Sequence, residues 1–259
     1  MNADAADKIA ALVCRDKPQS VLEIGAGAGA LTVRLLECVE RLRAMEIDRR
    51  LAEILREDLG AGDNLEIETT DILKVDLGAL LTPEEWQIVG NLPYYISGPI
   101  IGRLLEQKER FSRAVLMLQE EVADRLVAAP GNRTRGALSV KVQAFFEPHK
   151  EFRVKRSAFY PRPEVDSAVV SLARKEESGL STAREEALFN RLVEAGFAHR
   201  RKKLENSLLE ADFAADRTGL VGALDSLGIG GGRRAEELSV SEFVALAKYF
   251  VEEGNDASS

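Results

Sequence analysis

The glycine-rich turn near the start of the chain constrains the fold more than any other feature of the sequence. An apolar strand pattern at residues 21–24 runs directly into this turn, and a helical pattern follows at 31–40. Gly25, Gly27 and Ala30 fit the pattern G-x-G-x-x-[GA]. Glycines there let the backbone approach a ligand, and the helix N-terminus offers unpaired N–H groups. The segment predicts a nucleotide-binding strand–turn–helix unit, but the motif serves dinucleotides and S-adenosylmethionine alike.

Strand and helix patterns alternate through the first two thirds of the chain. We expect strands at 21–24, 43–48, 65–71, 87–91, 114–119, 150–156 and 167–173, and helices at 4–15, 31–40, 49–59, 100–107, 120–129 and 136–146. Such alternation implies a mostly parallel, doubly wound α/β sheet. A polar stretch at 175–179 is typical of a linker, and later helices are expected at 185–198, 200–209, 218–227 and 240–251. We predict an α/β domain over 1–177 and a small helical domain over 178–259.

Charge and cysteine content restrict the class of protein. A net charge of −8 and a pI of about 5.1 argue against a protein that coats nucleic acid, although a local basic face is compatible with them. The apolar runs are too short to cross a membrane, and no export leader precedes them. Cys14 and Cys38 have no metal spacing, suit a reducing compartment and argue against a disulfide scaffold. We therefore expect a cytoplasmic protein.

Acidic residues lie at the ends of three successive expected strands. Glu46 follows Gly25 by 21 residues, where a carboxylate can accept both hydroxyls of a ribose. Asp71 can accept a hydrogen bond from an adenine amino group, and Glu23 can meet a methionine amino group through the local backbone. Each acid alone could be a solvated strand end. Together they favour a cationic, adenosine-bearing cofactor over a dinucleotide, whose two phosphates would prefer fewer acids nearby.

The segment Asn91-Leu92-Pro93-Tyr94 ends another apolar strand pattern. Open α/β sheets bind their ligands at the carboxyl ends of strands. Asn91 offers an amide oxygen, Pro93 makes the turn rigid, and Tyr94 provides a flat apolar face. These features predict a seat for a planar ring that carries an amino group; the alternative is a strand followed by an ordinary proline turn.

A second aromatic segment carries two prolines and has basic neighbours. Pro161 and Pro163 fix an extended loop behind Phe159, which suits stacking on an unpaired base. The alternative is a rigid loop in which Phe159 fills part of the core. The candidate phosphate contacts, which could also form a solvated face, are Lys150, Arg153, Lys155 and Arg156 in one cluster and Arg200, Arg201, Lys202 and Lys203 in another.

Taken together, these motifs resemble the KsgA-type ribosomal RNA adenine dimethyltransferases. The resemblance covers about residues 5 to 250 and is carried by 21–27, 46–48, 91–94, 159–170 and 200–208. It implies a class I methyltransferase fold with a seven-stranded sheet and a helical C-terminal RNA-binding domain. It also implies that S-adenosylmethionine, without a metal, dimethylates the N6 amino groups of two adjacent adenines near the 3′ end of small-subunit rRNA. The implied partner is the 30S particle during its biogenesis, and the implied oligomeric state is a monomer.

The resemblance also assigns roles to individual residues. It implies that Gly25, Glu46, Asp71 and Asn91 bind the cofactor, and we add Glu23 and Gly27 from the turn itself. Asn91 and the Leu92 carbonyl would hold the target amino group, with Pro93, Tyr94 and Phe159 around the base. From the two basic clusters we expect Lys155, Arg156, Arg200, Arg201 and Lys202 to contact the RNA. The family pattern begins with a basic arm and a Gly-Gln-Asn-Phe-Leu-type motif over the cofactor, which is not found here, so we expect weaker binding of S-adenosylmethionine.

Three alternatives remain at this point. The first is a large-subunit rRNA adenine methyltransferase of the antibiotic-resistance type, against which the segments 159–163, 227–229 and 233–236 favour the small-subunit type. The second is an NAD-dependent oxidoreductase built on the glycine turn, for which the sequence offers no evident proton-relay residue. The third is a non-catalytic ribosome-assembly factor that keeps the fold and the RNA surface.

Overall fold

The chain folds into two compact units in the computed structural model, which describes residues 2–60, 62–81, 85–199 and 201–254. The first unit comprises Met1–Asp124 and Phe146–Arg174, and the second comprises Arg125–Phe145 and Lys175–Ser259. These units differ from the boundary expected at residue 177, because the internal segment 125–145 groups with the C-terminal helices. The functional boundary at residue 177 stays a prediction.

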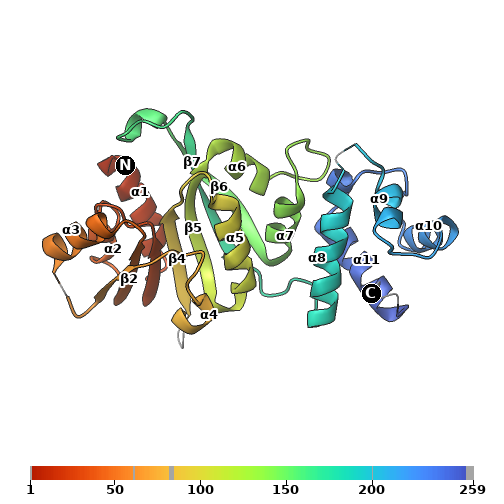
Figure 1. The fold of residues 1–259 in the computed structure, drawn as a ribbon, viewed down its shortest axis with the longest axis horizontal. Helices are drawn as coiled ribbons and strands as arrows, with labels where there is room; N and C mark the ends of the chain where they lie inside the picture. The colour runs from red at the N-terminus through yellow and green to blue at the C-terminus, as the bar shows by residue number, and fades with distance from the viewer. Residues whose placement is uncertain (1, 61, 82–84, 200, 255–259) are drawn as a thin grey trace. The chain divides into compact units, whose positions relative to one another are not determined.

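A seven-stranded sheet with the order β3-β2-β1-β4-β5-β7-β6 forms the centre of the first unit (Figure 1). β7 runs antiparallel to β5 and β6, while β3, β2, β1, β4 and β5 pair in parallel. The predicted mostly parallel, seven-stranded sheet is therefore confirmed. The strands are β1 (Ser20–Ile24), β2 (Arg41–Glu46), β3 (Leu65–Thr69), β4 (Trp86–Asn91), β5 (Phe111–Gln119), β6 (Phe146–Val154) and β7 (Ser167–Arg174).

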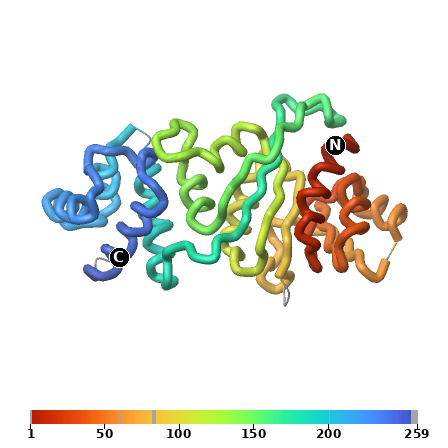
Figure 2. Tube along the Cα trace, turned by 180° about the vertical axis from the view of Figure 1, so that it is seen from behind, coloured from red at the N-terminus to blue at the C-terminus, as the bar shows by residue number. Residues whose placement is uncertain are grey.

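Helices cover both faces of this sheet. α5 lies in front of the sheet in Figure 1, and α1 lies in front of it in Figure 2, where the same unit is seen from behind. Every residue of β1 is buried, as expected for a parallel strand that is covered on both sides. The helices of this unit are α1 (Ala3–Cys14), α2 (Thr32–Leu35), α3 (Arg49–Leu59), α4 (Leu77–Leu80), α5 (Ser97–Glu106) and the start of α6 (Glu120–Leu126).

Several helices depart from the sequence pattern; α9 (Leu204–Glu210), for example, begins later than expected. α2 ends at Leu35 instead of continuing to residue 40, because the chain then turns to bury Val39 in the apolar core beside Leu35 before it enters β2. The short helix α4 was not predicted. The Asp76 carboxylate caps it by accepting a hydrogen bond from the Ala79 N–H at 3.1 Å.

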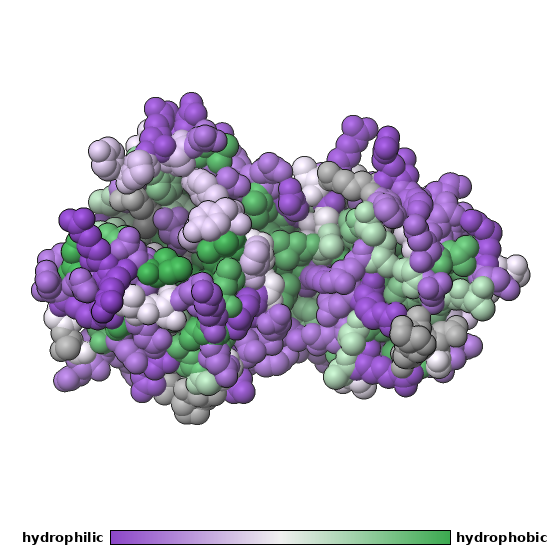
Figure 3. Space-filling view, in the orientation of Figure 1, coloured by the Kyte–Doolittle hydropathy of each residue, from purple (hydrophilic) through white to green (hydrophobic). Residues whose placement is uncertain are grey.

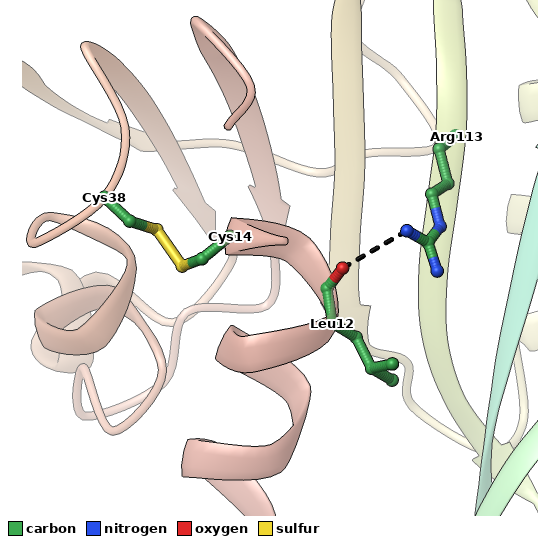
Figure 4. The surroundings of a disulfide bond; sticks show 4 residues. All are labelled: Leu12, Cys14, Cys38 and Arg113. Atoms are coloured by element: carbon green, nitrogen blue, oxygen red, sulfur yellow. Dashed lines mark hydrogen bonds between the residues drawn. A yellow bond between two sulfur atoms is a disulfide. The ribbon is translucent and has the colours of Figure 1, made fainter. Parts of the chain in front are cut away.

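The two cysteines are joined, which corrects the expectation of separate thiols. Cys14 ends α1 and Cys38 follows α2, and the structure places a disulfide between them with Cα atoms 5.7 Å apart (Figure 4). The end of α1 is also tied to the sheet, because the Arg113 guanidinium donates to the Leu12 carbonyl at 3.2 Å. Sequence spacing did not reveal the pairing, since it depends on α1 and α2 packing in one apolar layer.

The second unit is helical, as predicted. Its core contains an edge-to-face contact between Phe145 and Phe189, with ring centroids 6.4 Å apart, and a tilted contact between Phe213 and Phe250 at 5.8 Å. Among the residues that the structure describes, we find no helix with the length and apolar character needed to cross a bilayer. The helices are α7 (Ala137–Phe145), α8 (Ala183–Phe197), α9 (Leu204–Glu210), α10 (Arg217–Ser226) and α11 (Val240–Glu252).

Candidate active site

The carboxyl ends of four neighbouring parallel strands meet around a cavity in the first unit. β3, β2, β1 and β4 are adjacent in the sheet, so the residues that follow them lie at the same edge. The cavity has a volume of about 160 Å³. Figure 3 shows hydrophobic residues gathered in the middle of this unit's visible face, with hydrophilic residues around them. The cavity is lined by Ile24, Gly25, Met45, Glu46, Ile47, Thr70, Asp71, Ile72, Asn91, Pro93, Tyr95, Ile96 and Ile100.

The glycine turn brings β1 into direct contact with the end of β4. Gly25 has a φ of +76°, in the left-handed region that side chains disfavour. A Cβ atom at Gly25 would lie 3.4 Å from the Asn91 carbonyl oxygen. The Gly25 N–H donates to the Met45 carbonyl at 2.8 Å, which ties the turn to β2 as well. The turn therefore places three strand ends against one another.

Glu46 is held in a fixed orientation at the cavity wall. Its Oε2 accepts a hydrogen bond from the Gly27 N–H at 2.7 Å, and its Oε1 accepts one from the Asp48 N–H at 2.9 Å. The residue is 7% exposed. A carboxylate has about four lone-pair positions, so two remain for hydroxyl donors such as those of a ribose. Gly27 itself is not among the cavity-lining residues; it acts on the site by orienting Glu46.

Asp71 and two isoleucines form a further part of the lining. The Asp71 Oδ1 accepts from the Leu73 N–H at 3.0 Å, which fixes the carboxylate at the end of β3. Ile47 and Ile72 flank the acidic residues, and Ile47 is 63% exposed. Apolar side chains beside a fixed acceptor suit a flat, amino-bearing ring such as adenine. Neither isoleucine is among the predicted site residues, although an isoleucine directly follows Glu46 and another follows Asp71.

A second cavity, of about 270 Å³, adjoins the first. The two cavities share Asn91 and Pro93, so these residues lie between them. The Tyr94 hydroxyl is 2.7 Å from the Ser167 Oγ, a hydrogen bond that fixes the ring against the start of β7. The second cavity is lined by Asn91, Leu92, Pro93, Tyr94, Phe159, Pro161 and Pro163.

The position of Phe159 is compatible with both roles that its sequence context allowed. Its ring is half-buried and packs against the apolar core cluster, as the core-filling interpretation requires. It also lines the second cavity together with Tyr94, as the base-stacking interpretation requires. The structure thus brings residues 91–94 and 159–163 together, although more than 60 residues separate them in the chain.

Glu23 lies beneath the site and does not line either cavity. It is 2% exposed, and its Oε2 accepts a hydrogen bond from the Thr32 hydroxyl at 2.7 Å. Burial raises the pKa of Glu23 to about 7; the Thr32 hydrogen bond opposes this rise and the nearby Glu46 charge adds to it. Any contact with a ligand amino group would therefore run through the backbone of the turn.

We expect the buried carboxyl of Glu23 to make stability depend on pH. Between its ordinary pKa of 4.5 and about 7, the native state keeps a proton that the unfolded chain has lost. The free energy of unfolding therefore falls by about 3 kcal/mol as pH rises through this window. The Gln side chain in Glu23→Gln still accepts a hydrogen bond from the Thr32 hydroxyl but cannot ionise. The free energy of unfolding of Glu23→Gln, relative to that of the wild type, should therefore increase from pH 4.5 to pH 8.

Urea unfolding followed by the fluorescence of Trp86, the single tryptophan, measures this difference. Parallel pH profiles for the wild type and Glu23→Gln would contradict the expectation, and the exposed Glu53→Gln serves as the matched control.

Several of the predicted phosphate contacts already have hydrogen-bond or ion-pair partners within the chain. Arg156 donates through its backbone N–H to the Asp166 carboxylate at 2.8 Å and through its guanidinium to the Glu164 carbonyl at 3.0 Å. Lys202 pairs with Glu210. Lys155 and Arg201 are exposed, while Arg200 lies outside the described residues. The other cluster is similar: Lys150 pairs with Glu120 and Asp124, and Arg153 pairs with Glu120 and Asp166.

The donor set at this site is that of a nucleoside pocket. The part of the chain that the structure describes contains no group of three or more His, Cys, Asp or Glu side chains placed to hold a metal. Glu46 can hold a ribose and Asp71 an adenine amino group, and Asn91 lines both this cavity and the adjoining one. The residues present therefore fit S-adenosylmethionine in the first cavity and a second planar group in the adjoining one.

Comparison with known proteins agrees with this geometry. The sequence profile of ribosomal RNA adenine dimethylases matches residues 1–252. A ribosomal RNA small subunit methyltransferase A from Geobacter metallireducens is 41% identical over 244 residues, which is 93% of this chain and 88% of the relative. The protein of the same name from Syntrophotalea carbinolica is 44% identical over 234 residues, 88% of this chain and 84% of the relative.

Solved structures share the architecture over nearly the whole chain. The crystal structure of a dimethyladenosine transferase from Plasmodium falciparum has a TM-score of 0.84 and 28% identity, covering 98% of both chains. The crystal structure of the 23S rRNA methyltransferase ErmE has a TM-score of 0.74 and 29% identity, covering 97% of this chain and 98% of the other. The fold, the site and the sequence matches lead to one conclusion: this chain belongs to the ribosomal RNA adenine dimethylase family.

Proposed function

We propose that this protein transfers methyl groups from S-adenosylmethionine to the N6 amino groups of two adjacent adenines near the 3′ end of small-subunit rRNA. The observation that carries the proposal is the pair of adjoining cavities that share Asn91 and Pro93. One cavity has the acidic and apolar lining of a nucleoside site, and the other has the aromatic lining of a site for an unstacked base. Family membership decides against the NAD-dependent oxidoreductase.

The cofactor would occupy the first cavity. Glu46 would accept the ribose hydroxyls, Asp71 the adenine amino group, and the turn at Gly25 would lie against the methionine part. When bound, S-adenosylmethionine supplies an electrophilic methyl group on a cationic sulfur. The carboxylates of Glu46 and Asp71 at this edge of the sheet would favour that positive charge.

The residues of the second cavity would prepare the target adenine. Its exocyclic amino nitrogen is a weak nucleophile because its lone pair is delocalised into the ring. The Asn91 amide oxygen and the Leu92 carbonyl accept hydrogen bonds from the two N–H groups, which orients the nitrogen toward the first cavity. Tyr94 and Phe159 would hold the base by stacking, at about 1–3 kcal/mol per stacked base. Positioning supplies most of the rate acceleration, so no dedicated general base is required.

The partner in this proposal is the small ribosomal subunit, and the protein acts as a monomer in the cytoplasm during subunit biogenesis. The relatives named small subunit methyltransferase A, at 41% and 44% identity, support this choice of substrate. The test is transfer of labelled methyl groups from S-adenosylmethionine to unmodified small subunits, followed by mapping of the modified nucleotides. We expect two adjacent dimethylated adenines near the 3′ end of the RNA.

One observation favours a second candidate, the large-subunit rRNA adenine methyltransferase. The structure of the 23S rRNA methyltransferase ErmE matches this chain over 97% of its length. The two candidates differ in substrate, so naked large-subunit rRNA is the decisive comparison. Methylation of that RNA, with none on small subunits, would replace the proposal by the second candidate.

A further inference from the structure

Tyr160 is a large aromatic side chain that the fold leaves in solvent. It is 98% exposed and lies on the connection from β6 to β7, residues 155–166, which we call the proline loop. Figures 1 and 2 show this loop extending beyond the end of the sheet in the first unit. Single exposed apolar residues are common on protein surfaces, so exposure alone assigns no role to Tyr160.

The position of Tyr160 follows from its own exposure and from its two neighbours in the chain. Phe159 packs on the core and lines the second cavity. The Tyr160 side chain is 98% exposed, so it points into solvent. Pro161, the next residue, lines that cavity again. Tyr160 therefore stands at the rim of the cavity proposed for the target adenine.

The proline loop is held in place by the residues at its two ends. The Asp166 carboxylate accepts from the Arg156 N–H and from the Arg153 guanidinium, each at 2.8 Å, and these contacts lower the pKa of Asp166. Arg156 also donates to the Glu164 carbonyl at 3.0 Å. A loop that is already ordered pays less conformational entropy when it binds a partner.

Charge around the ring favours a nucleic acid over a protein partner. Lys155, Arg156 and Arg162 are exposed on the same loop and Glu164 is its exposed acid, so cations outnumber acids on the surface of the segment that carries the ring. Aromatic rings combined with cations are the usual means of binding unpaired nucleotides, because every base offers a stacking face and every phosphate a negative charge. Val165, 44% exposed on the same loop, lacks such a ring.

We propose that Tyr160 stacks on the nucleotide that adjoins the target adenine in the RNA. The inference rests on the proposed function and deepens it. When the adenine enters the second cavity it loses its stacking on its neighbour. Phe159 replaces that stacking for the adenine inside the cavity, and Tyr160 replaces it for the neighbour outside. The two consecutive residues thus hold the two halves of a separated base stack.

The test compares Tyr160→Ala with Tyr160→Phe and Tyr160→Trp in methyl transfer to unmodified small subunits. We expect Tyr160→Ala to raise KM by about 10-fold, with a smaller effect on kcat, since stacking contributes mainly to binding. Tyr160→Phe and Tyr160→Trp keep a flat ring and should stay within about twofold of the wild type. Val165→Ala, which removes an aliphatic side chain from the same loop, is the matched control and should behave as the wild type does.

A spectroscopic measurement separates stacking from a merely structural role. Small subunits reconstituted with 2-aminopurine next to the adenine pair should lose fluorescence when the wild type or Tyr160→Phe binds, and should keep it with Tyr160→Ala. An unchanged KM in Tyr160→Ala, or equal losses in Tyr160→Ala and Tyr160→Phe, would overturn the inference; the second result would indicate a protein contact through the hydroxyl. If the wild type itself fails to methylate small subunits, the proposed function fails instead.

Discussion

Asn91→Ala is expected to lower kcat for adenine methylation by at least about 100-fold, comparable to the loss of one preorganised hydrogen-bonding group in other active sites. Asn91 lines both cavities, and its amide oxygen is the side-chain acceptor that we propose for the target amino group. Without it, the target amino group keeps only the Leu92 carbonyl as its acceptor and is no longer held in line with the donor site. Single-turnover methyl transfer to unmodified small subunits at saturating S-adenosylmethionine measures the effect.

Asn91→Asp is the matched variant for this prediction. It keeps an acceptor oxygen of the same shape at the same place, so we expect it to retain at least about tenfold more activity than Asn91→Ala. Thermal unfolding of both variants checks that β4 is intact. A kcat for Asn91→Ala within tenfold of the wild type would contradict the proposed role. Asn91→Ala also distinguishes an enzyme from a non-catalytic assembly factor. Assembly of the small subunit would survive this substitution, whereas methylation would not.

Gly90→Ala is expected to destabilise the first unit by about 2–4 kcal/mol, because the added methyl group has no space. A Cβ atom at Gly90 would lie 2.8 Å from the Ile24 carbonyl oxygen and 3.0 Å from the Leu92 Cδ2. Ile24 and Gly90 are register partners in the β1–β4 ladder, so the clash can be relieved only by moving backbone. Urea unfolding detected by the fluorescence of Trp86, which lies in the same strand, measures the loss.

Gly102→Ala provides the control for Gly90→Ala. Gly102 lies inside α5, and a Cβ atom there would meet nothing within 4 Å. Alanine has the higher helix propensity, so this variant should be neutral or more stable by up to about 1 kcal/mol. If Gly90→Ala unfolds at the same urea concentration as Gly102→Ala, the prediction is wrong. The close approach of β1 and β4 would then not explain why residue 90 is a glycine.

The sequence by itself determined the elements that carry the site. The glycine turn, the acids at the strand ends and the segment 91–94 all came from local patterns, and the structure places Gly25, Glu46, Asp71 and Asn91 around one cavity. These residues come together because the alternation of strands and helices fixes a parallel sheet, and a parallel sheet brings the carboxyl ends of its strands to one edge. Left-handed backbone at Gly25 is likewise a local requirement that glycine reveals.

Only the tertiary structure decided which distant residues meet. The hydrogen bond between Tyr94 and Ser167, the disulfide between Cys14 and Cys38, and the grouping of segment 125–145 with the C-terminal helices all depend on strand order and helix packing. The same holds for the raised pKa of Glu23, which comes from burial. Local periodicity tells which face of an element is buried, but it does not tell which other element covers that face, and this is the physical reason the sequence left these features open.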